Sequence, residues 1–134
     1  RTMPAMLEAG KLGSRSAKVG FDWPDPAGLF DKLQEEIAEL QAELQPELQS
    51  SPTPTHAAEE ELGDLLFTAV NLARHLRIDP ESALRSANAK FRARFTHMEQ
   101  VAGGSAGLEE LRPEQLEELW SAAKQTTPQT GPGA

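Results

Sequence analysis

The sequence predicts an all-α helical bundle, and three observations support this fold class. The chain has 134 residues, of which five are Phe, two are Trp and none is Tyr. Aromatic and β-branched residues, which favour β-strands, are therefore scarce, whereas Leu, Ala, Glu and Gln, which favour helices, are common. Apolar residues recur at intervals of three and four, which is the helical period. Prolines gather between these periodic segments, where they end one helix and begin the next.

Composition excludes several classes of protein. The chain contains 21 acidic and 13 basic residues, a net charge of −8, and no cysteine. It therefore has no disulfide framework, thiolate nucleophile or cysteine metal site. The acidic balance argues against a nucleic-acid binder, no apolar run approaches a membrane span, and the first residues given lack the apolar stretch of a secretion signal. We expect a cytoplasmic protein that binds neither nucleic acid nor membranes. Its length predicts a single domain over 1–134, ordered over about 3–125, with a flexible tail at 126–134.

The amino-terminal half predicts two helices. Residues 4–17 form a short helix, with Pro4 in its first turn. Residues 19–26 contain two prolines, a glycine and two large aromatic side chains, so we expect a compact connection. A long helix follows over 25–45. Its apolar positions form a seam for another helix: Phe30, Leu33, Ile37, Leu40 and Leu44.

The remaining segments predict three more helices and their connections. A proline-rich loop spans 46–55, and a helix with a wide apolar face follows over 57–76. Asp79 is expected to cap a helix that starts at Pro80. Residues 103–107 read as a flexible link, and 113–125 as a last short helix. The helix after Asp79 is expected to carry these residues inward: Leu84, Ala87, Phe91 and Phe95.

Acidic residues at matched positions are the most informative feature of the sequence. Glu36 and Glu39 share one flank of the long helix, because residues three or four apart lie on one helical face. Glu61 and Asp64 occupy the same angular offset on the next helix. If these two helices pair in antiparallel orientation through their apolar seams, the four carboxylates converge at the edge of the seam.

Such a cluster, with no lysine expected nearby, repels itself unless a cation neutralises it. Oxygen ligands suit Mg²⁺ or Mn²⁺, and Mg²⁺ commonly shares its coordination with substrate phosphates. The pattern therefore favours a phosphate-bearing substrate. The alternative is a solvated helix face, since glutamate is a strong helix former and occurs on many exposed helical surfaces.

Several segments together resemble a known family. Glu35-Glu36-Ile37-Ala38-Glu39 followed by Glu61-Leu62-Gly63-Asp64 is similar to the paired acidic motifs of MazG-type nucleoside triphosphate pyrophosphohydrolases. The surrounding segments resemble the carboxyl-terminal domain of MazG proteins, and the likeness covers roughly 3–125. These segments are 19–24, 60–67, 70–74 and Asn88-x-Lys90-Phe91-x-x-Arg94-Phe95.

The resemblance implies a helical bundle of the dimeric-dUTPase type, completed by a homodimer or higher homo-oligomer. It implies Mg²⁺-dependent hydrolysis of nucleoside triphosphates to monophosphates and pyrophosphate. The implied metal ligands are Glu36, Glu39, Glu61 and Asp64. The implied substrate contacts are Lys90, Arg94, Trp120 and Lys124, and Asn71 is a further candidate on the acidic flank. Glu35, one turn before Glu39, is the candidate to orient or deprotonate the water, so Glu35 and Glu39 form the catalytic pair.

Several alternatives remain open at the level of sequence. The enzyme is either a broad housekeeper of the nucleotide pool or a narrow dUTP or dCTP pyrophosphatase, and the rival outside enzymes is a non-catalytic helical dimerisation module. Lys90 and Arg94 are alternatively surface charges. Trp120 is alternatively a core or dimer residue, and Asn71 a buried hydrogen-bonding side chain. Phe21 and Trp23 are predicted to be packing residues. Because full-length MazG proteins have two related domains, this chain is either an excised domain or a stand-alone short form.

Overall fold

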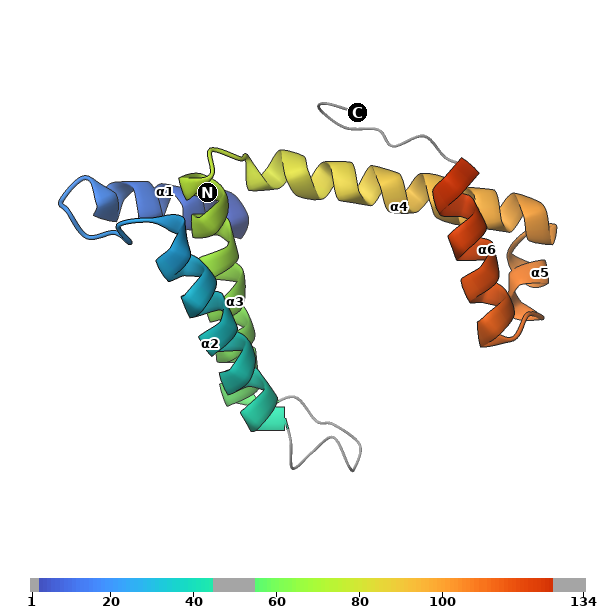
Figure 1. The fold of residues 1–134 in the computed structure, drawn as a ribbon, viewed down its shortest axis with the longest axis horizontal. Coiled ribbons are helices and arrows are strands. Elements are labelled where there is room, and N and C mark those ends of the chain that lie inside the picture. Colours follow the sequence, from blue (N-terminus) through green and yellow to red (C-terminus); the bar gives the residue numbers. More distant parts are fainter. Residues whose placement is uncertain (1–2, 45–54, 127–134) are drawn as a thin grey trace. The chain divides into compact units, whose positions relative to one another are not determined.

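The computed structural model describes residues 3–44 and 55–126, which contain helices and no strand (Figure 1). The helices are α1 (Ala5–Ala17), α2 (Pro26–Leu44), α3 (His56–His75), α4 (Pro80–Ala102), α5 (Ser105–Glu109) and α6 (Pro113–Thr126). The predicted all-α class is confirmed. Internal contacts divide the chain into two compact units, Arg1–Glu81 and Ser82–Ala134. Each unit is described by itself, and the expectation of one domain over 1–134 stays a prediction.

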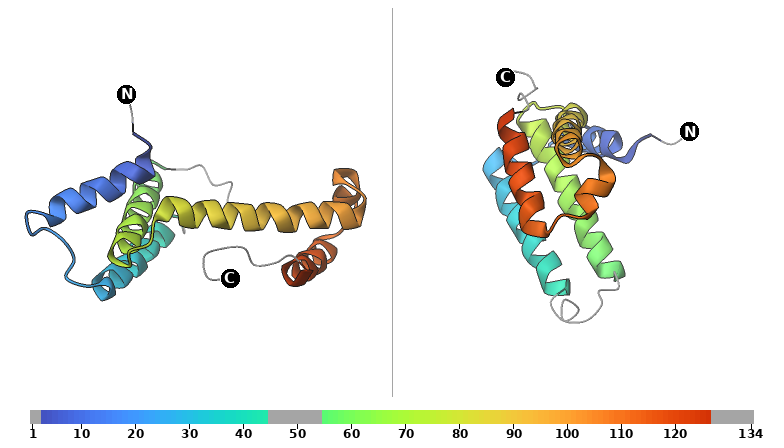
Figure 2. Two further views of the ribbon diagram at one scale, coloured as in Figure 1. Left: turned by 90° about the horizontal axis from the view of Figure 1, so that it is seen from above. Right: turned by 90° about the vertical axis from the view of Figure 1, so that its right-hand side faces the viewer.

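The first unit is built on the antiparallel pair of α2 and α3, which lie side by side in Figures 1 and 2. Leu29 of α2 is completely buried, and Ala58 near the start of α3 is almost completely buried. Helix α1 packs against α3, where a Cβ built on Gly10 would lie 3.8 Å from a methyl group of Val70. This pairing places the acidic residues of α2 opposite those of α3.

Two helices of the first unit end in the same type of turn. After α1, the Phe21 N–H donates to the Ser16 carbonyl, and Gly20 adopts a φ of 86°. After α3, the Ile78 N–H donates to the Ala73 carbonyl, and Arg77 adopts a φ of 59°. Both turns have the hydrogen bonds of a Schellman motif, whose left-handed position favours glycine. Phe21 therefore leaves α1 in a direction fixed by a hydrogen-bonded turn.

The second unit contains most of α4 together with α5 and α6. Its core consists of Met98, Leu108 and Ala123, one residue from each helix. The predicted link at 103–107 is partly wrong, because α5 begins at Ser105 within it. Asp79 accepts a hydrogen bond from the Glu81 N–H at 3.2 Å, which confirms that its side chain caps the start of α4.

Several apolar residues expected to face inward are exposed. On α4 these are Leu84, Ala87, Phe91 and Phe95, and the α2 seam likewise exposes Phe30 and Ile37. The prediction of inward faces is wrong for the isolated chain, since periodicity identifies an apolar face without showing what covers it. Most of the predicted loop at 46–55, and the tail after Thr126, lie outside the described residues. Among the described helices, none combines the length and the apolar character that a membrane span requires.

Candidate functional site

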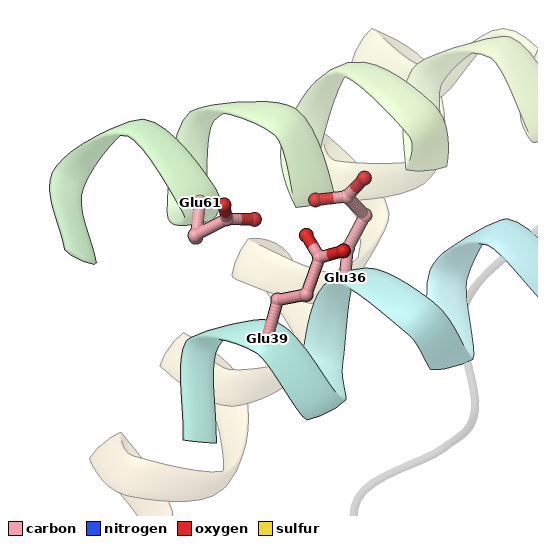
Figure 3. Close-up of side chains that lie close together, drawn as sticks. All are labelled: Glu36, Glu39 and Glu61. Atoms are coloured by element: carbon pink, nitrogen blue, oxygen red, sulfur yellow. The ribbon is translucent and has the colours of Figure 1, made fainter. Parts of the chain in front are cut away.

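Three glutamates from two helices meet between α2 and α3. Glu36 and Glu39 lie on α2, and Glu61 lies opposite them on α3 (Figure 3). One carboxylate oxygen of each lies within 4.8 Å of those of the other two. We call these residues the acidic trio. Asp64, one turn after Glu61, is exposed and lies outside this trio, so the structure brings together three of the four predicted metal ligands.

Burial makes the acidic trio different from a solvated helix face. Glu36 is only 3% exposed, whereas Glu39 is exposed and Glu61 is half-buried. The Oε2 atoms of Glu36 and Glu61 are buried and have no hydrogen-bond partner among the described residues. Buried acceptors without partners are destabilising, and a divalent cation with oxygen ligands would satisfy both. The donor set therefore fits Mg²⁺ or Mn²⁺.

The electrostatics of the acidic trio show the same crowding. Contacts with the carboxylates of Glu36 and then Glu39 raise the pKa of Glu61 to about 7. A carboxylate that shares its site with other acids holds its proton more tightly, because a second negative charge is disfavoured. The acidic trio thus concentrates more negative charge than the protein neutralises.

A lysine does lie beside the acidic trio, contrary to the sequence expectation. Lys32 Nζ is 2.9 Å from Glu36 Oε1 and 3.4 Å from Glu35 Oε1. Its hydrogen bond holds the pKa of Glu36 below its usual value. The one positive charge of Lys32 offsets part of the repulsion between the carboxylates, and the acidic trio keeps an excess of negative charge. Glu35 itself is 56% exposed, contacts Lys32 and lies outside the trio.

The predicted substrate cations lie in the second unit. Arg94 is 8% exposed, and its guanidinium carbon lies 5.6 Å from the centre of the Trp120 ring. Its Nε has no hydrogen-bond partner among the described residues. The structure thus brings Arg94 and Trp120 together by a cation–π contact. Lys90 is half-buried one turn before Arg94, and Lys124 is exposed on α6.

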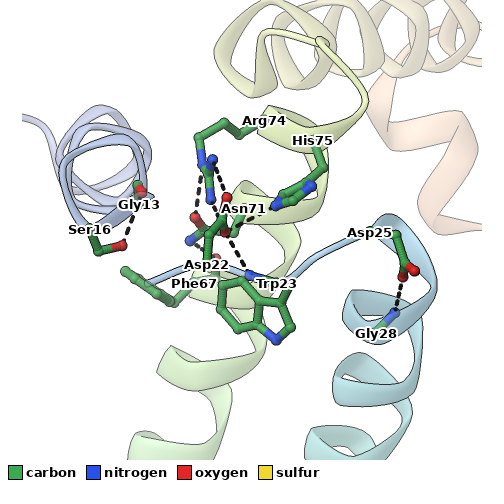
Figure 4. A network of polar contacts seen from close by, with 10 residues as sticks. All are labelled: Gly13, Ser16, Asp22, Trp23, Asp25, Gly28, Phe67, Asn71, Arg74 and His75. Carbon is green, nitrogen blue, oxygen red and sulfur yellow. Dashed lines mark hydrogen bonds and ion pairs between the residues drawn. The ribbon is translucent and has the colours of Figure 1, made fainter. Parts of the chain in front are cut away.

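Asn71 is completely buried in the first unit, where both ends of its amide are engaged. Its Oδ1 accepts from Arg74 Nε at 3.2 Å, and its Nδ2 donates to the Phe67 carbonyl at 3.0 Å (Figure 4). The hydrogen bonds support the alternative of a buried structural asparagine. Contact between this amide and a substrate stays a prediction.

Sequence analysis missed the polar network that surrounds Asn71. Asp22 Oδ1 and Oδ2 accept from the Arg74 guanidinium at 2.7 and 3.1 Å, and His75 Nε2 lies 3.0 Å from Oδ1 (Figure 4). The Arg74 hydrogen bonds hold the pKa of Asp22 far below its usual value. Asp22 and Arg74 are 52 residues apart, so no local spacing indicates their pairing.

Comparisons with known proteins agree with the geometry of the acidic trio. Residues 25–99 match the MazG nucleotide pyrophosphohydrolase domain. The chain belongs to this family. The matched region includes the whole acidic trio as well as Asp64, Lys90 and Arg94. The resemblance inferred from the motifs is confirmed.

Relatives of this MazG domain carry matching names. The nucleoside triphosphate pyrophosphohydrolase/pyrophosphatase MazG of Thermotoga maritima is 44% identical over 123 residues, 91% of this chain and 45% of that protein. The nucleoside triphosphate pyrophosphohydrolase of Escherichia coli K12 is 41% identical over 126 residues, 92% of this chain and 46% of that protein. YabN of Bacillus subtilis, an uncharacterized protein, is 42% identical over 72 residues, 53% of this chain and 15% of that protein. The chain thus spans less than half the length of the first two relatives.

Proposed function

We propose that this MazG domain is a Mg²⁺-dependent nucleoside triphosphate pyrophosphohydrolase that serves in nucleotide-pool housekeeping. It would hydrolyse ribo- or deoxyribonucleoside triphosphates to the monophosphate and pyrophosphate. The observation that carries the proposal is the acidic trio, in which two buried carboxylate oxygens have no hydrogen-bond partner in the described part of the chain. The names of the two relatives support the same reaction.

Four acids would hold the metal in this proposal. Glu36, Glu39 and Glu61 already face one another, and Asp64 stands one turn further along α3. A Mg²⁺ ion held by these acids would supply Lewis-acid stabilisation of the phosphate oxygens and would make a nearby water more acidic. Mn²⁺ prefers similar oxygen ligands and is the alternative ion.

The chain's own residues supply the remaining chemistry. The oxygen of a water molecule forms a bond to the α-phosphorus, and the bond from that phosphorus to the α–β bridging oxygen breaks. Pyrophosphate leaves with the electron pair of the broken bond. Glu35, exposed outside the acidic trio, is the proposed acceptor of the water proton, with Glu39 one turn away as its partner in orienting the water.

Four residues of the second unit are the proposed substrate contacts. Lys90 and Arg94 share one face of α4 and would neutralise the triphosphate. Arg94 is 8% exposed, and its buried Nε has no hydrogen-bond partner among the described residues, so a small rearrangement would be needed for this atom to meet a phosphate. Trp120 holds that guanidinium through its ring, and Lys124 lies one turn further along α6.

We also propose that the protein functions as a homodimer or higher homo-oligomer. Large apolar side chains are exposed on α2 and α4, including Phe30, Ile37, Phe91 and Phe95. Exposed apolar surface on this scale marks an interaction surface. Size-exclusion chromatography with light scattering should report at least two chains per particle, and a monomer at micromolar concentration would contradict the proposal.

Pyrophosphate release from a panel of all common ribo- and deoxyribonucleoside triphosphates tests the proposed reaction. We expect release with Mg²⁺ and none with EDTA. A broad profile supports the housekeeping role, whereas turnover of dUTP or dCTP alone identifies a narrow pyrophosphatase. A folded protein without turnover on any substrate would instead indicate a non-catalytic dimerisation module.

A further inference from the structure

Aromatic side chains line a cavity in the same unit as the acidic trio. The cavity has a volume of about 500 Å³ and lies between α1, the connection after it, and α3. Its walls include Phe21, Trp23 and Phe67, which are three of the seven aromatic residues in the sequence. Ligand pockets typically have volumes of about 300–1,000 Å³, so this cavity suits a small planar ligand.

The aromatic wall is held in place by the elements already described. Phe21 is 79% exposed, and the turn at Gly20 fixes its position after α1. The Trp23 backbone N–H donates to Asp22 Oδ1 at 2.9 Å, and Arg74 anchors the same carboxylate (Figure 4). A large aromatic ring left in solvent on a fixed turn offers a face on which a planar ligand can stack.

The polar groups on the cavity wall are already engaged within the protein. Asp22 is paired with Arg74 and His75, and both ends of the Asn71 amide are bonded. The Ser16 hydroxyl donates to the Gly13 carbonyl at 3.0 Å. The cavity therefore offers aromatic faces and few free hydrogen-bonding groups that could recognise the edge of a ligand.

Helix α3 connects this cavity to the acidic residues. Asp64, Phe67 and Asn71 follow one another at intervals of three and four, so they lie along one face of α3. Phe67 stands one turn from Asp64, and each turn advances about 5.4 Å along the helix.

We propose that this cavity is the nucleobase subsite of the enzyme and binds bases by stacking on Phe21, Trp23 and Phe67. The proposal rests on the proposed function, because it assumes that a nucleoside triphosphate occupies the acidic trio. Every base has a π-face, so stacking accepts purines and pyrimidines alike. A site without hydrogen-bond readout discriminates weakly between bases, which favours the broad enzyme over the narrow dUTP or dCTP pyrophosphatase.

The test compares Phe21→Leu and Phe67→Leu with the wild-type protein. Both changes keep an apolar side chain and remove the aromatic face. We expect KM for ATP and CTP to rise about fivefold to tenfold, with kcat within about twofold, because stacking on each ring stabilises the bound base. Inorganic tripolyphosphate has the phosphates without a base, so its inhibition constant should stay unchanged. Val19→Ala is the control, since Val19 is 82% exposed before the same turn and does not line the cavity.

The possible results distinguish a failure of the proposed nucleobase subsite from a failure of the proposed reaction. An active wild type with unchanged KM in both variants overturns the subsite, as does an equal rise in KM and in the tripolyphosphate inhibition constant. A similar rise in KM in Val19→Ala also overturns it. A wild type without pyrophosphate release refutes the proposed function instead, and quenching of Trp fluorescence by AMP and CMP then tests the cavity alone. Quenching that Phe67→Leu weakens supports the subsite, and no quenching overturns it.

Discussion

Asp22 and Arg74 form a bidentate ion pair that joins the connection after α1 to the last turn of α3. The two hydrogen bonds measure 2.7 and 3.1 Å, and each side chain is about one-fifth exposed. Arg74 also donates to Asn71, and Asp22 also accepts from the Trp23 backbone. One ion pair therefore fixes both the closing turn of α3 and the aromatic residue that follows Asp22.

Asp22→Asn should destabilise the first unit by about 2 kcal/mol, because it removes charge-assisted hydrogen bonds and leaves the Arg74 guanidinium partly unpaired. The free energy of unfolding in urea, followed by circular dichroism, measures this loss. Asp31→Asn is the control, since Asp31 is an exposed acid on α2. Equal stability of the two variants would contradict the role of the ion pair.

The stabilising effect of the Asp22 carboxylate should be lost in acid. Its pKa is lowered in the folded protein from an ordinary value of 3.8, chiefly by the Arg74 hydrogen bonds. A lowered folded pKa contributes stability that is fully present above the unfolded pKa and is lost as pH falls through the folded pKa. The difference in unfolding free energy between wild type and Asp22→Asn should therefore be constant at neutral pH and shrink below about pH 4. A difference that stays constant down to pH 2 would contradict this assignment.

Local patterns predicted most of the fold. The helix expected over 57–76 spans His56–His75, and the one expected over 113–125 spans Pro113–Thr126. Helical period and capping residues depend on a few neighbouring positions, so they can be recognised in the sequence alone. Helix α5 was missed because five residues next to two glycines are too short to show a period. The exposed apolar faces were also missed, because their burial depends on what covers them.

The acidic trio was predictable for the same reason, since the spacing of its glutamates places them on facing helix flanks. Lys32 was missed although it precedes Glu36 by four residues, a spacing that brings opposite charges together on a helix. The pairing of Asp22 with Arg74 joins segments 52 residues apart, and only the folded chain shows it. Long-range polar contacts of this kind leave no periodic signal.

Gly13→Ala should destabilise the protein by about 2 kcal/mol, because a methyl group there would overlap the Asn71 side-chain oxygen and crowd Arg74 Nε. Thermal unfolding monitored by circular dichroism measures the effect. Gly63→Ala is a sharp control, because nothing lies within 4 Å of a Cβ built at that position on α3. Alanine forms helices better than glycine by about 1 kcal/mol, so this variant should be stabilised. Similar behaviour of the two variants would refute the close approach of α1 to α3.

Arg77→Gly should stabilise the protein by about 0.5–1 kcal/mol, which is unusual for a substitution by glycine. Arg77 is exposed and adopts a φ of 59°, a conformation that costs an L-residue about 1 kcal/mol or more relative to glycine. The midpoint of urea unfolding measures the gain. Arg85→Gly within α4 is the opposite control and should lose stability, because glycine weakens a helix interior. A loss of stability in both variants would contradict the strain assigned to Arg77.

Glu61→Gln should separate the stability of the acidic trio from its function. The variant removes one negative charge next to Glu36 and Glu39, so its melting temperature in EDTA should equal or exceed that of the wild type. Its melting temperature should no longer rise with Mg²⁺, because a neutral amide binds a divalent cation more weakly than a carboxylate does. Pyrophosphate release should fall by at least tenfold. Glu59→Gln, on the exposed side of the first turn of α3, should keep both the Mg²⁺ response and the turnover of the wild type. If Glu61→Gln also keeps them, the trio does not hold the metal.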